Sequence, residues 1–188
     1  QEIERLVHGT TIGTNAVLER RGAKTAVLTT RGFRDLLELG QTRRMAPNTL
    51  FDLTFRRPEP LVPRPLRFDV DERMLASGDV REPLNRECLS AVAEELAAKG
   101  VESIAVCYLH SYAYPQHEQE TARIIGELCD LPVVMSHAAC REHREYERFS
   151  SGAVHGAVMP RVRGYLQNID AGLQRMGVTA PVWVMQSN

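Results

Sequence analysis

The stretch VESIAVCYLHSYAYPQHEQETARIIGELCDLPVVMSH, residues 101–137, decides the fold. It opens with an apolar run, 101–110, that has the length and composition of a buried strand. Residues 115–129 follow with apolar side chains at helical spacing, and Pro115 stands near the first turn. A second apolar run, 132–137, closes the stretch. A strand, a helix and a strand joined by short loops predict a βαβ unit with parallel strands.

Further elements extend this alternation in both directions along the chain. Asn85 can cap a helix that Gly100 ends, and Pro160 interrupts a longer stretch of helical spacing. The expected elements are a strand over 24–30, helices over 32–40, 85–100 and 141–177, and a last strand over 181–186. Strands that alternate with helices in this way place the chain in the α/β class.

One segment of the chain has a different character. Residues 41–65 carry five prolines and show no sustained period, so we expect an ordered excursion there. Residues 66–75 then alternate apolar and polar side chains, and the sequence SGD at 77–79 is typical of a tight turn. A β-hairpin excursion is therefore expected beside the main alternation.

Composition and charge exclude several classes of protein. The 188 residues are 43% hydrophobic and carry a net charge of −1, so no basic field favours nucleic acid or anionic lipid. No apolar run reaches the roughly 20 residues that a membrane span needs. The first residues also lack the apolar core of a secretory signal. We expect a cytoplasmic protein with neither a membrane nor a nucleic-acid partner.

The four cysteines form no CxxC pair and fit no disulfide framework, so we expect reduced thiols and no bound metal. They are Cys88, Cys107, Cys129 and Cys140. His137, Cys140 and His143 do form an H-x2-C-x2-H pattern, which leaves a metal site open as the alternative. A zinc site normally takes a fourth ligand, and this pattern supplies three.

The sequence GTTIGTN, residues 9–15, offers polar side chains where a short helix begins. The free backbone N–H groups of a helix start can hold an anion, and Thr10, Thr11, Thr14 and Asn15 add hydroxyl and amide groups. The alternative is a plain capped helix, with residues 13–15 as the cap and Gly22 as the end. The spacing matches neither a P-loop nor a dinucleotide fingerprint, so it does not decide between the two.

Two further groups of polar residues are candidates for ligand binding. His110 and Ser111 end a predicted parallel strand, where ligands of α/β sheets bind, although a polar loop is the alternative. Arg144 and Arg148 can turn inward to hold a carboxylate or phosphate, or can lie on a solvated, ion-paired helix face.

Three other polar residues are assigned structural or surface positions. We expect His117 and Glu118, in the first turn of a helix, to be solvated. His155 lies in the apolar run AVHGAV and is expected to be an interior histidine. No catalytic residue is assigned.

Six motifs together resemble the N-terminal region of the hydantoinase A/5-oxoprolinase family, which includes acetone-carboxylase-type subunits. In chain order they are HGTTIGTNAVLERRGAKTAVLTTRGFRDLLELG (8–40), RPEPLVPRPLRFDVDERM (57–74), GVESIAVCYLHSY (100–112), PQHE (115–118), EYER (145–148) and VMQSN (184–188). They stand in the family's order, so the resemblance covers nearly the whole chain.

The resemblance implies a fragment of an actin/sugar-kinase/Hsp70-like ATPase that opens a hydantoin or 5-oxoproline ring by phosphorylating its carbonyl oxygen. It implies ATP and Mg in the full-length protein, a hydantoinase B-type subunit or domain as partner, and an oligomer. Residues 1–140 then form the N-terminal region and 141–188 begin the next domain. Both phosphate loops of the family fall outside 1–188, so no cofactor is expected in this fragment alone.

On the same resemblance, Thr10, Thr11, Thr14 and Asn15 lie near the nucleotide or the substrate carbonyl, and His110, Ser111, Arg144 and Arg148 bind substrate. The chain departs from the family pattern at positions that include Tyr114, Phe149, Gly152, His155 and Ala157. These changes leave two alternatives open, a subunit of an ATP-dependent ketone carboxylase and a non-catalytic binding or assembly subunit. If the changed helix lines a pocket, Gly152 and Ala157 are expected to enlarge it.

Overall fold

The computed structural model describes residues 4–40, 54, 56 and 58–185, and its centre is a four-stranded parallel sheet. The strand order is β3-β2-β6-β7, and every neighbouring pair is parallel. These strands are β2 (Thr25–Thr30), β3 (Arg67–Val70), β6 (Ser103–Cys107) and β7 (Val133–Met135). The predicted α/β class and its parallel strands are confirmed.

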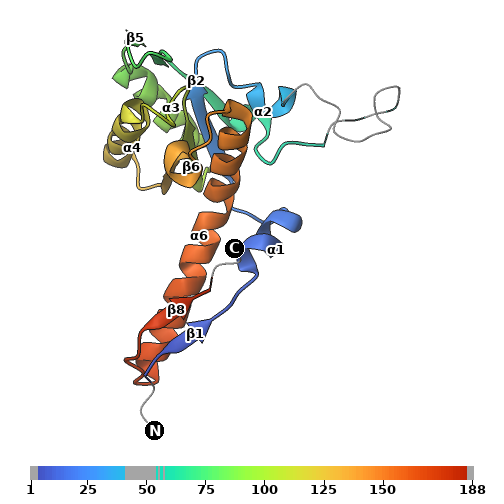
Figure 1. The fold of residues 1–188 in the computed structure, drawn as a ribbon, viewed down its shortest axis with the longest axis vertical. Coiled ribbons are helices and arrows are strands. Elements are labelled where there is room, and N and C mark those ends of the chain that lie inside the picture. Colours follow the sequence, from blue (N-terminus) through green and yellow to red (C-terminus); the bar gives the residue numbers. More distant parts are fainter. Residues whose placement is uncertain (1–3, 41–53, 55, 57, 186–188) are drawn as a thin grey trace.

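Helices cover both faces of this sheet (Figure 1). The crossover helices α3 (Arg86–Ala98) and α4 (Gln116–Leu128) pack against each other on one face, as right-handed connections require. The first half of α6 (Glu145–Arg175) crosses the other face. Strand β2 is buried at all six positions and β6 at all five, as expected for a sheet covered on both sides.

Small residues let α6 lie close to the sheet. A Cβ added at Gly156 would stand 2.9 Å from Cγ2 of Thr25, and one added at Gly152 would stand 3.0 Å from Sγ of Cys107. Phe149, on the same face of the helix, is fully buried in the core. Pro160 lies inside α6, but the helix continues through it, so the predicted interruption is wrong.

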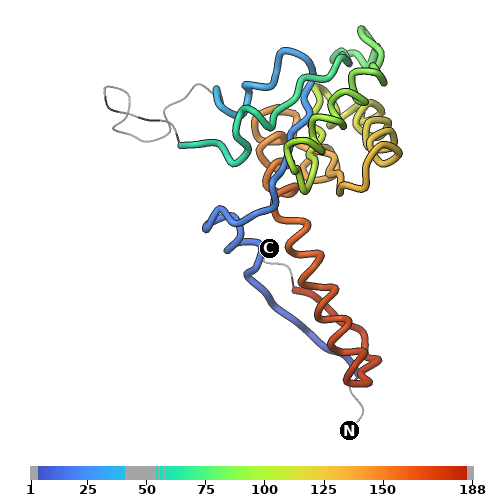
Figure 2. The backbone as a smooth tube through the Cα atoms, turned by 180° about the vertical axis from the view of Figure 1, so that it is seen from behind, coloured from blue at the N-terminus to red at the C-terminus, as the bar shows by residue number. Residues whose placement is uncertain are grey.

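The second half of α6 extends beyond the sheet and carries a smaller assembly (Figure 2). Here β1 (Leu6–His8) pairs in parallel with β8 (Val182–Val184), although the two strands lie at opposite ends of the chain. Helix α1 (Ile12–Leu18) packs against α6, and Nε2 of His8 lies 2.8 Å from the hydroxyl of Tyr165. Strand β1 was not expected from the sequence.

Several predicted boundaries need correction. Helix α1 begins at Ile12 with Thr11 as N-cap, so residues 13–15 form its first turn and not its cap. Helix α2 is a single turn, Leu36–Leu39. Residues 66–75 divide into β3, which joins the main sheet, and β4 (Arg73–Met74), which forms the expected antiparallel hairpin with β5 (Val80–Glu82). Two short turns, η1 (Arg64–Leu66) and α5 (Ser136–Ala139), complete the elements.

Most of the excursion expected over 41–65 lies outside the described residues. No helix in the described part of the chain is both long and apolar enough to cross a membrane.

Candidate ligand-binding site

The carboxyl ends of the four parallel strands meet at one edge of the sheet, and Glu118 of α4 joins three segments there. Its Oε1 accepts from the Tyr108 amide at 3.0 Å and from the Ser136 hydroxyl at 2.5 Å. Its Oε2 accepts from the His137 amide at 3.1 Å and lies 2.6 Å from Nδ1 of the same histidine. Glu118 is fully buried, so its predicted exposure to solvent is wrong.

A second buried carboxylate, Glu72, lies at the same edge. Its Oε2 is 2.7 Å from Nδ1 of His117, and its Oε1 accepts from the Thr30 hydroxyl. That hydroxyl in turn accepts from the Leu109 amide at 3.1 Å. The end of β6 is therefore held by two carboxylates, one through Tyr108 and one through Thr30 and Leu109.

These two glutamates were missed because apolar periodicity carries no signal for a buried carboxylate. For Glu118 the usable signal was its position: the PQHE sequence starts the helix that follows the turn after a strand, where free backbone amides need acceptors. The glutamates keep the 108–112 turn in place.

Arg148 is fully buried and fixes the start of α6 against this edge. Its guanidinium donates to the carbonyl oxygens of Tyr108 at 2.9 Å and Glu142 at 2.7 Å. It also stands over the rings of Tyr112 and Phe149, 5.6 and 5.5 Å from their centroids. Arg148 therefore does not lie on a solvated helix face, while the binding of a carboxylate or phosphate stays a prediction. The hydrogen-bond acceptors that it meets belong to the chain itself.

The other predicted residues of the edge lie on the turn after β6 and at the start of α6. His110 has a left-handed backbone conformation, φ 57°, and its carbonyl accepts from the amides of Ala113 and Tyr114. The buried Ser111 hydroxyl lies 3.3 Å from that of Ser136. Arg144 is the N-cap of α6 and its side chain is exposed, with a 3.9 Å ion pair to Glu147.

A groove of about 1140 Å³ runs between α1 and α6, and we call it the α1–α6 groove. Mostly apolar side chains line it, together with a few polar groups and one cation. The lining residues are Gly13, Thr14, Val17, Leu18, Ser150, Ser151, Val154, His155, Val158, Met159, Val162, Arg163, Leu166 and Gln167. Of the four predicted residues of the GTTIGTN sequence, the structure brings Thr14 to this groove.

Local contacts account for the rest of that sequence. Oγ1 of Thr10 accepts from the Ile12 amide at 3.2 Å, and Oγ1 of Thr11 accepts from the Asn15 side chain at 3.3 Å. These bonds satisfy polar groups at the start of α1. Thr11, Thr14 and Asn15 remain exposed, so their side chains are accessible to a ligand.

The departures from the family pattern in α6 fall on two faces of the helix. Phe149 and Gly152 pack against the core, and Ala157 is buried beside Gly22, with its carbonyl accepting from the Ala23 amide at 2.7 Å. These residues are packed against neighbours, so Gly152 and Ala157 do not enlarge a pocket. His155 is exposed and lines the α1–α6 groove, so its assignment to the interior is wrong.

One thiol and one phenol near the edge are buried. Burial raises the pKa of the Cys107 thiol and of the Tyr108 phenol well above their ordinary values. All four cysteines are free. Within the described residues no group of three or more His, Cys, Asp or Glu side chains is arranged to hold a metal ion.

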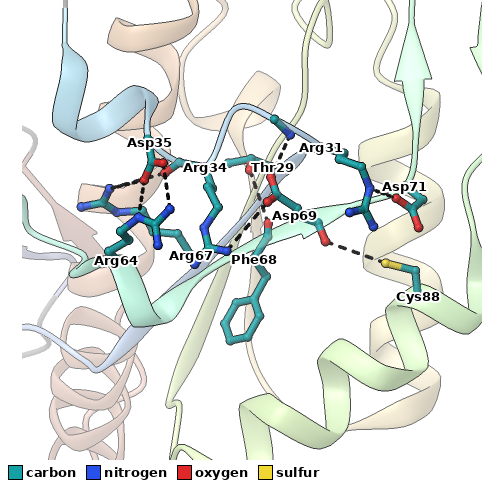
Figure 3. A network of polar contacts seen from close by, with 11 residues as sticks. Thr29, Arg31, Arg34, Asp35, Arg64, Arg67, Phe68, Asp69, Asp71 and Cys88 are labelled. Atoms are coloured by element: carbon teal, nitrogen blue, oxygen red, sulfur yellow. Dashed lines mark hydrogen bonds and ion pairs between the residues drawn. The ribbon is translucent and has the colours of Figure 1, made fainter.

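A separate network of arginines and aspartates lies at the β3 edge of the sheet (Figure 3). Arg64 makes a bidentate contact with Asp35 at 2.8 and 3.0 Å, and this contact holds the pKa of the Asp35 carboxyl below its usual value. Arg31 pairs with Asp71 and lowers the pKa of that carboxyl in the same way. The buried Arg67 bonds to the Val62 carbonyl and to Glu38.

The chain is similar to a known protein family and to several known proteins. A model of the hydantoinase/oxoprolinase N-terminal region matches residues 1–129. The chain is 30% identical over 183 residues to caprolactamase subunit alpha of Pseudomonas jessenii, covering 97% of this chain and 26% of that one. It is 32% identical over 184 residues to 5-oxoprolinase 1 of Arabidopsis thaliana, covering 88% of this chain and 14% of that one.

Two solved structures share the fold. The crystal structure of the ATP-dependent caprolactamase from Pseudomonas jessenii matches with a TM-score of 0.88 at 29% identity, over 98% of this chain and 27% of that chain. The nucleotide-free structure of acetone carboxylase matches with a TM-score of 0.83 at 27% identity, over 97% and 27%. The chain therefore spans about a quarter of the length of each of these two chains.

Proposed function

Because the chain belongs to the hydantoinase/oxoprolinase family, we propose that it forms part of an ATP-dependent hydrolase that opens cyclic amides. The observation that carries this proposal is the structural match to the ATP-dependent caprolactamase, which extends over 98% of the chain. A lactam carbonyl is a poor electrophile because of amide resonance. ATP would supply the activation that ring opening requires.

In this proposal the α1–α6 groove faces the ring substrate. Its apolar lining suits the methylene groups of a ring, while Thr14, Ser151 and His155 offer the few polar contacts that orient it. Thr10 and Thr11 directly precede α1 and Asn15 lies in its first turn, and in the proposal these residues contact the nucleotide or the substrate carbonyl.

The sheet edge has a supporting part in the proposal. His110, Ser111 and Arg144 bind substrate groups that reach the edge. Arg148 contributes through the Tyr108 carbonyl, because it positions the turn that carries His110 and Ser111. Glu118 holds the same turn from its other side.

The residues of the groove do not fit a magnesium–triphosphate group. Arg163 is the one cation among the lining residues, and no carboxylate stands among them to coordinate a metal. We therefore assign no step of nucleotide chemistry to this groove. In the proposal, the triphosphate of ATP and its Mg are bound by other parts of the intact protein. Residues 1–140 form the N-terminal region, and 141–188 begin the next domain.

A carboxylase subunit is the second candidate, and the match to acetone carboxylase favours it. A hydantoinase B-type partner fits either candidate, since the caprolactamase relative is itself named as a subunit. The non-catalytic alternative loses some of its support. Phe149, Gly152 and Ala157 are packed in the interior and need not alter a binding surface.

The test is an assay of the intact protein with its partner. ATP hydrolysis is measured with a panel of lactams and hydantoins, and separately with a ketone and bicarbonate. Stimulation by cyclic amides supports the hydrolase, and stimulation only by ketone with bicarbonate assigns the carboxylase. No stimulation by either class, in a protein that binds ATP, contradicts both enzymes.

A pair of tryptophan variants tests the groove itself. Val154→Trp fills the groove, whereas Arg161→Trp places the same side chain on α6 at an exposed position outside the groove. We expect Val154→Trp to lower kcat/KM for the ring substrate about tenfold or more, with Arg161→Trp within twofold of the parent. Equal effects of the two variants on kcat/KM would contradict the proposal that the α1–α6 groove binds the ring substrate.

A further inference from the structure

A second pocket, of about 380 Å³, lies at the β3 edge of the sheet, away from the α1–α6 groove. The loop after β2, strand β3 and helix α3 form its walls. Four cationic and two acidic side chains are among its lining residues, which are Arg31, Arg34, Pro65, Arg67, Phe68, Asp69, Cys88, Ala91, Val92, Glu95 and Lys99. None of them lines the groove assigned to the ring substrate.

The guanidinium of Arg34 is the feature that points to a ligand. It donates no hydrogen bond to any residue that the structure describes, and its Nε is buried without a partner. Its nearest acid, Asp69, lies 3.9 Å from Nη1, beyond hydrogen-bond distance. A partly buried guanidinium without acceptors is costly, because its desolvation is not compensated.

Two neighbouring arginines, by contrast, have acceptors for their guanidinium groups. Arg64 has both oxygens of Asp35, and Arg67 has the Val62 carbonyl and Glu38. Figure 3 shows Arg34 between the Asp35–Arg64 pair and Asp69, with its contact drawn to Asp69. Asp69 is already engaged, since its Oδ1 accepts from the Gly32 amide at 3.0 Å.

Two more cations face the same pocket. Arg31 pairs with Asp71 through Nε, and its terminal nitrogens donate no hydrogen bond to a described residue. Nζ of Lys99 lies 4.7 Å from the centroid of the Phe68 ring and 2.8 Å from Glu95. The pocket thus combines N–H donors of Arg34 and Arg31 that are free within the described residues with a lining of four cationic and two acidic side chains.

We propose that this pocket binds a small oxyanion of the phosphate class, with Arg34 as its principal ligand and Arg31 and Lys99 in support. The planar guanidinium presents paired donors that match two oxygens of a phosphate. The volume, near the lower end of the range for small-molecule sites, also accommodates a phosphate monoester or pyrophosphate.

The test measures phosphate and pyrophosphate binding to the intact protein by calorimetry, at an ionic strength kept constant with chloride. Acetate serves as a third probe, because a site built for carboxylates would take it equally well. Arg34→Gln removes the proposed ligand, and Arg64→Gln is the matched control, since Arg64 belongs to the same network and does not line the pocket. Melting temperatures confirm that both variants are folded.

We expect saturable phosphate or pyrophosphate binding that Arg34→Gln weakens at least tenfold and Arg64→Gln changes less than twofold. Should Arg34→Gln fail to fold, Arg34→Lys, which keeps the charge and loses the paired donors, replaces it and should weaken binding severalfold. Phosphate bound elsewhere in the protein is insensitive to these changes. Binding that is absent, that acetate matches, or that responds equally to both substitutions would overturn the proposal.

Discussion

Glu118 shows how much of the structure at the carboxyl ends of the parallel strands can depend on one residue. Its carboxylate is fully buried and is bonded to two segments: the end of β6, and the start of α5 with the His137 ring. A buried carboxylate is stable only where donors surround it, and here four donor groups do so.

Replacing Glu118 by Gln should therefore lower the free energy of unfolding by about 3 kcal/mol or more, because the new amide N–H₂ would face donors. Urea denaturation of the purified chain measures the change. Glu120→Gln is the control on the same helix, since Glu120 pairs with Arg123 at the surface, and its replacement should have little effect. Equal effects of the two substitutions would mean that the four hydrogen bonds of Glu118 contribute little to the free energy of unfolding.

Asp35 gives a prediction about pH. The hydrogen bonds from Arg64 hold the pKa of this carboxyl below its ordinary value of 3.8. A lowered pKa in the folded state stabilises the fold above pH 3.8, and this stabilisation is lost as the pH falls through the lower folded value. The effect is small because both side chains are about half exposed.

The stability difference between the parent and Asp35→Asn should accordingly be present at neutral pH and shrink as the pH falls below 4. Thermal melts at a series of pH values check this. Asp130→Asn, at an exposed position, is the control for the removal of one carboxylate charge from the surface. A difference for Asp35→Asn that stays constant down to the lowest pH would contradict the assignment.

At the scale of elements, α6 has two halves with different demands on sequence. Its first half lies against the sheet and needs glycine at Gly152 and Gly156, where an added Cβ would approach a neighbour to 3.0 and 2.9 Å. Its second half passes beyond the sheet, and an added Cβ at Gly164 meets nothing within 4 Å. Glycine thus permits close packing against the sheet in the first half of α6. In the second half, at Gly164, it only lowers the helix propensity.

Matched alanine substitutions in chain 1–188 should separate these two roles. Gly164→Ala should raise the free energy of unfolding by about 0.5–1 kcal/mol, from helix propensity alone. Gly156→Ala should lower it by about 1–3 kcal/mol, because the new methyl group collides with Thr25. Chemical denaturation measures both, and a stabilising Gly156→Ala would show that α6 can move away from the sheet without cost.

The elements also show what the sequence could and could not predict. The βαβ alternation was predictable because β2 and β6 are buried on both faces and therefore read as continuous apolar runs. Strand β1 was not, because three residues gain their strand conformation only by pairing with β8 at the other end of the chain.

The site was predicted only in part, for related physical reasons. The polar strand end at His110 and Ser111 follows from a general rule for parallel sheets. Glu118 depends on amides that come together only in the folded chain, and His155 lies on the exposed face of a helix whose local apolar run suggested burial. The local sequence pattern therefore predicts which elements form better than it predicts which face of each element is buried.

At the scale of the whole molecule, exposed apolar side chains gather on the part built from α1, β1, β8 and the second half of α6. Val7, Leu18, Met176, Trp183 and Met185 are each more than half exposed. The sheet and its covering helices, by contrast, enclose a continuous core. Since the caprolactamase chain that shares this fold is about four times as long, we expect the rest of the intact protein to cover the apolar part.

Trp183 reports on this directly, because it is the one tryptophan of the sequence and the residue is 64% exposed. In chain 1–188 its fluorescence should be that of a water-exposed indole and should be quenched readily by acrylamide. In the intact protein, the signal lost on Trp183→Phe should lie at shorter wavelength and resist quenching, because apolar contacts exclude water from the ring. Tyr165→Phe, which keeps a ring beside His8, is a control for general disturbance of this part. A Trp183 signal that is equally red-shifted and equally quenched in both proteins would mean that the β1–β8 surface stays open to solvent in the intact protein.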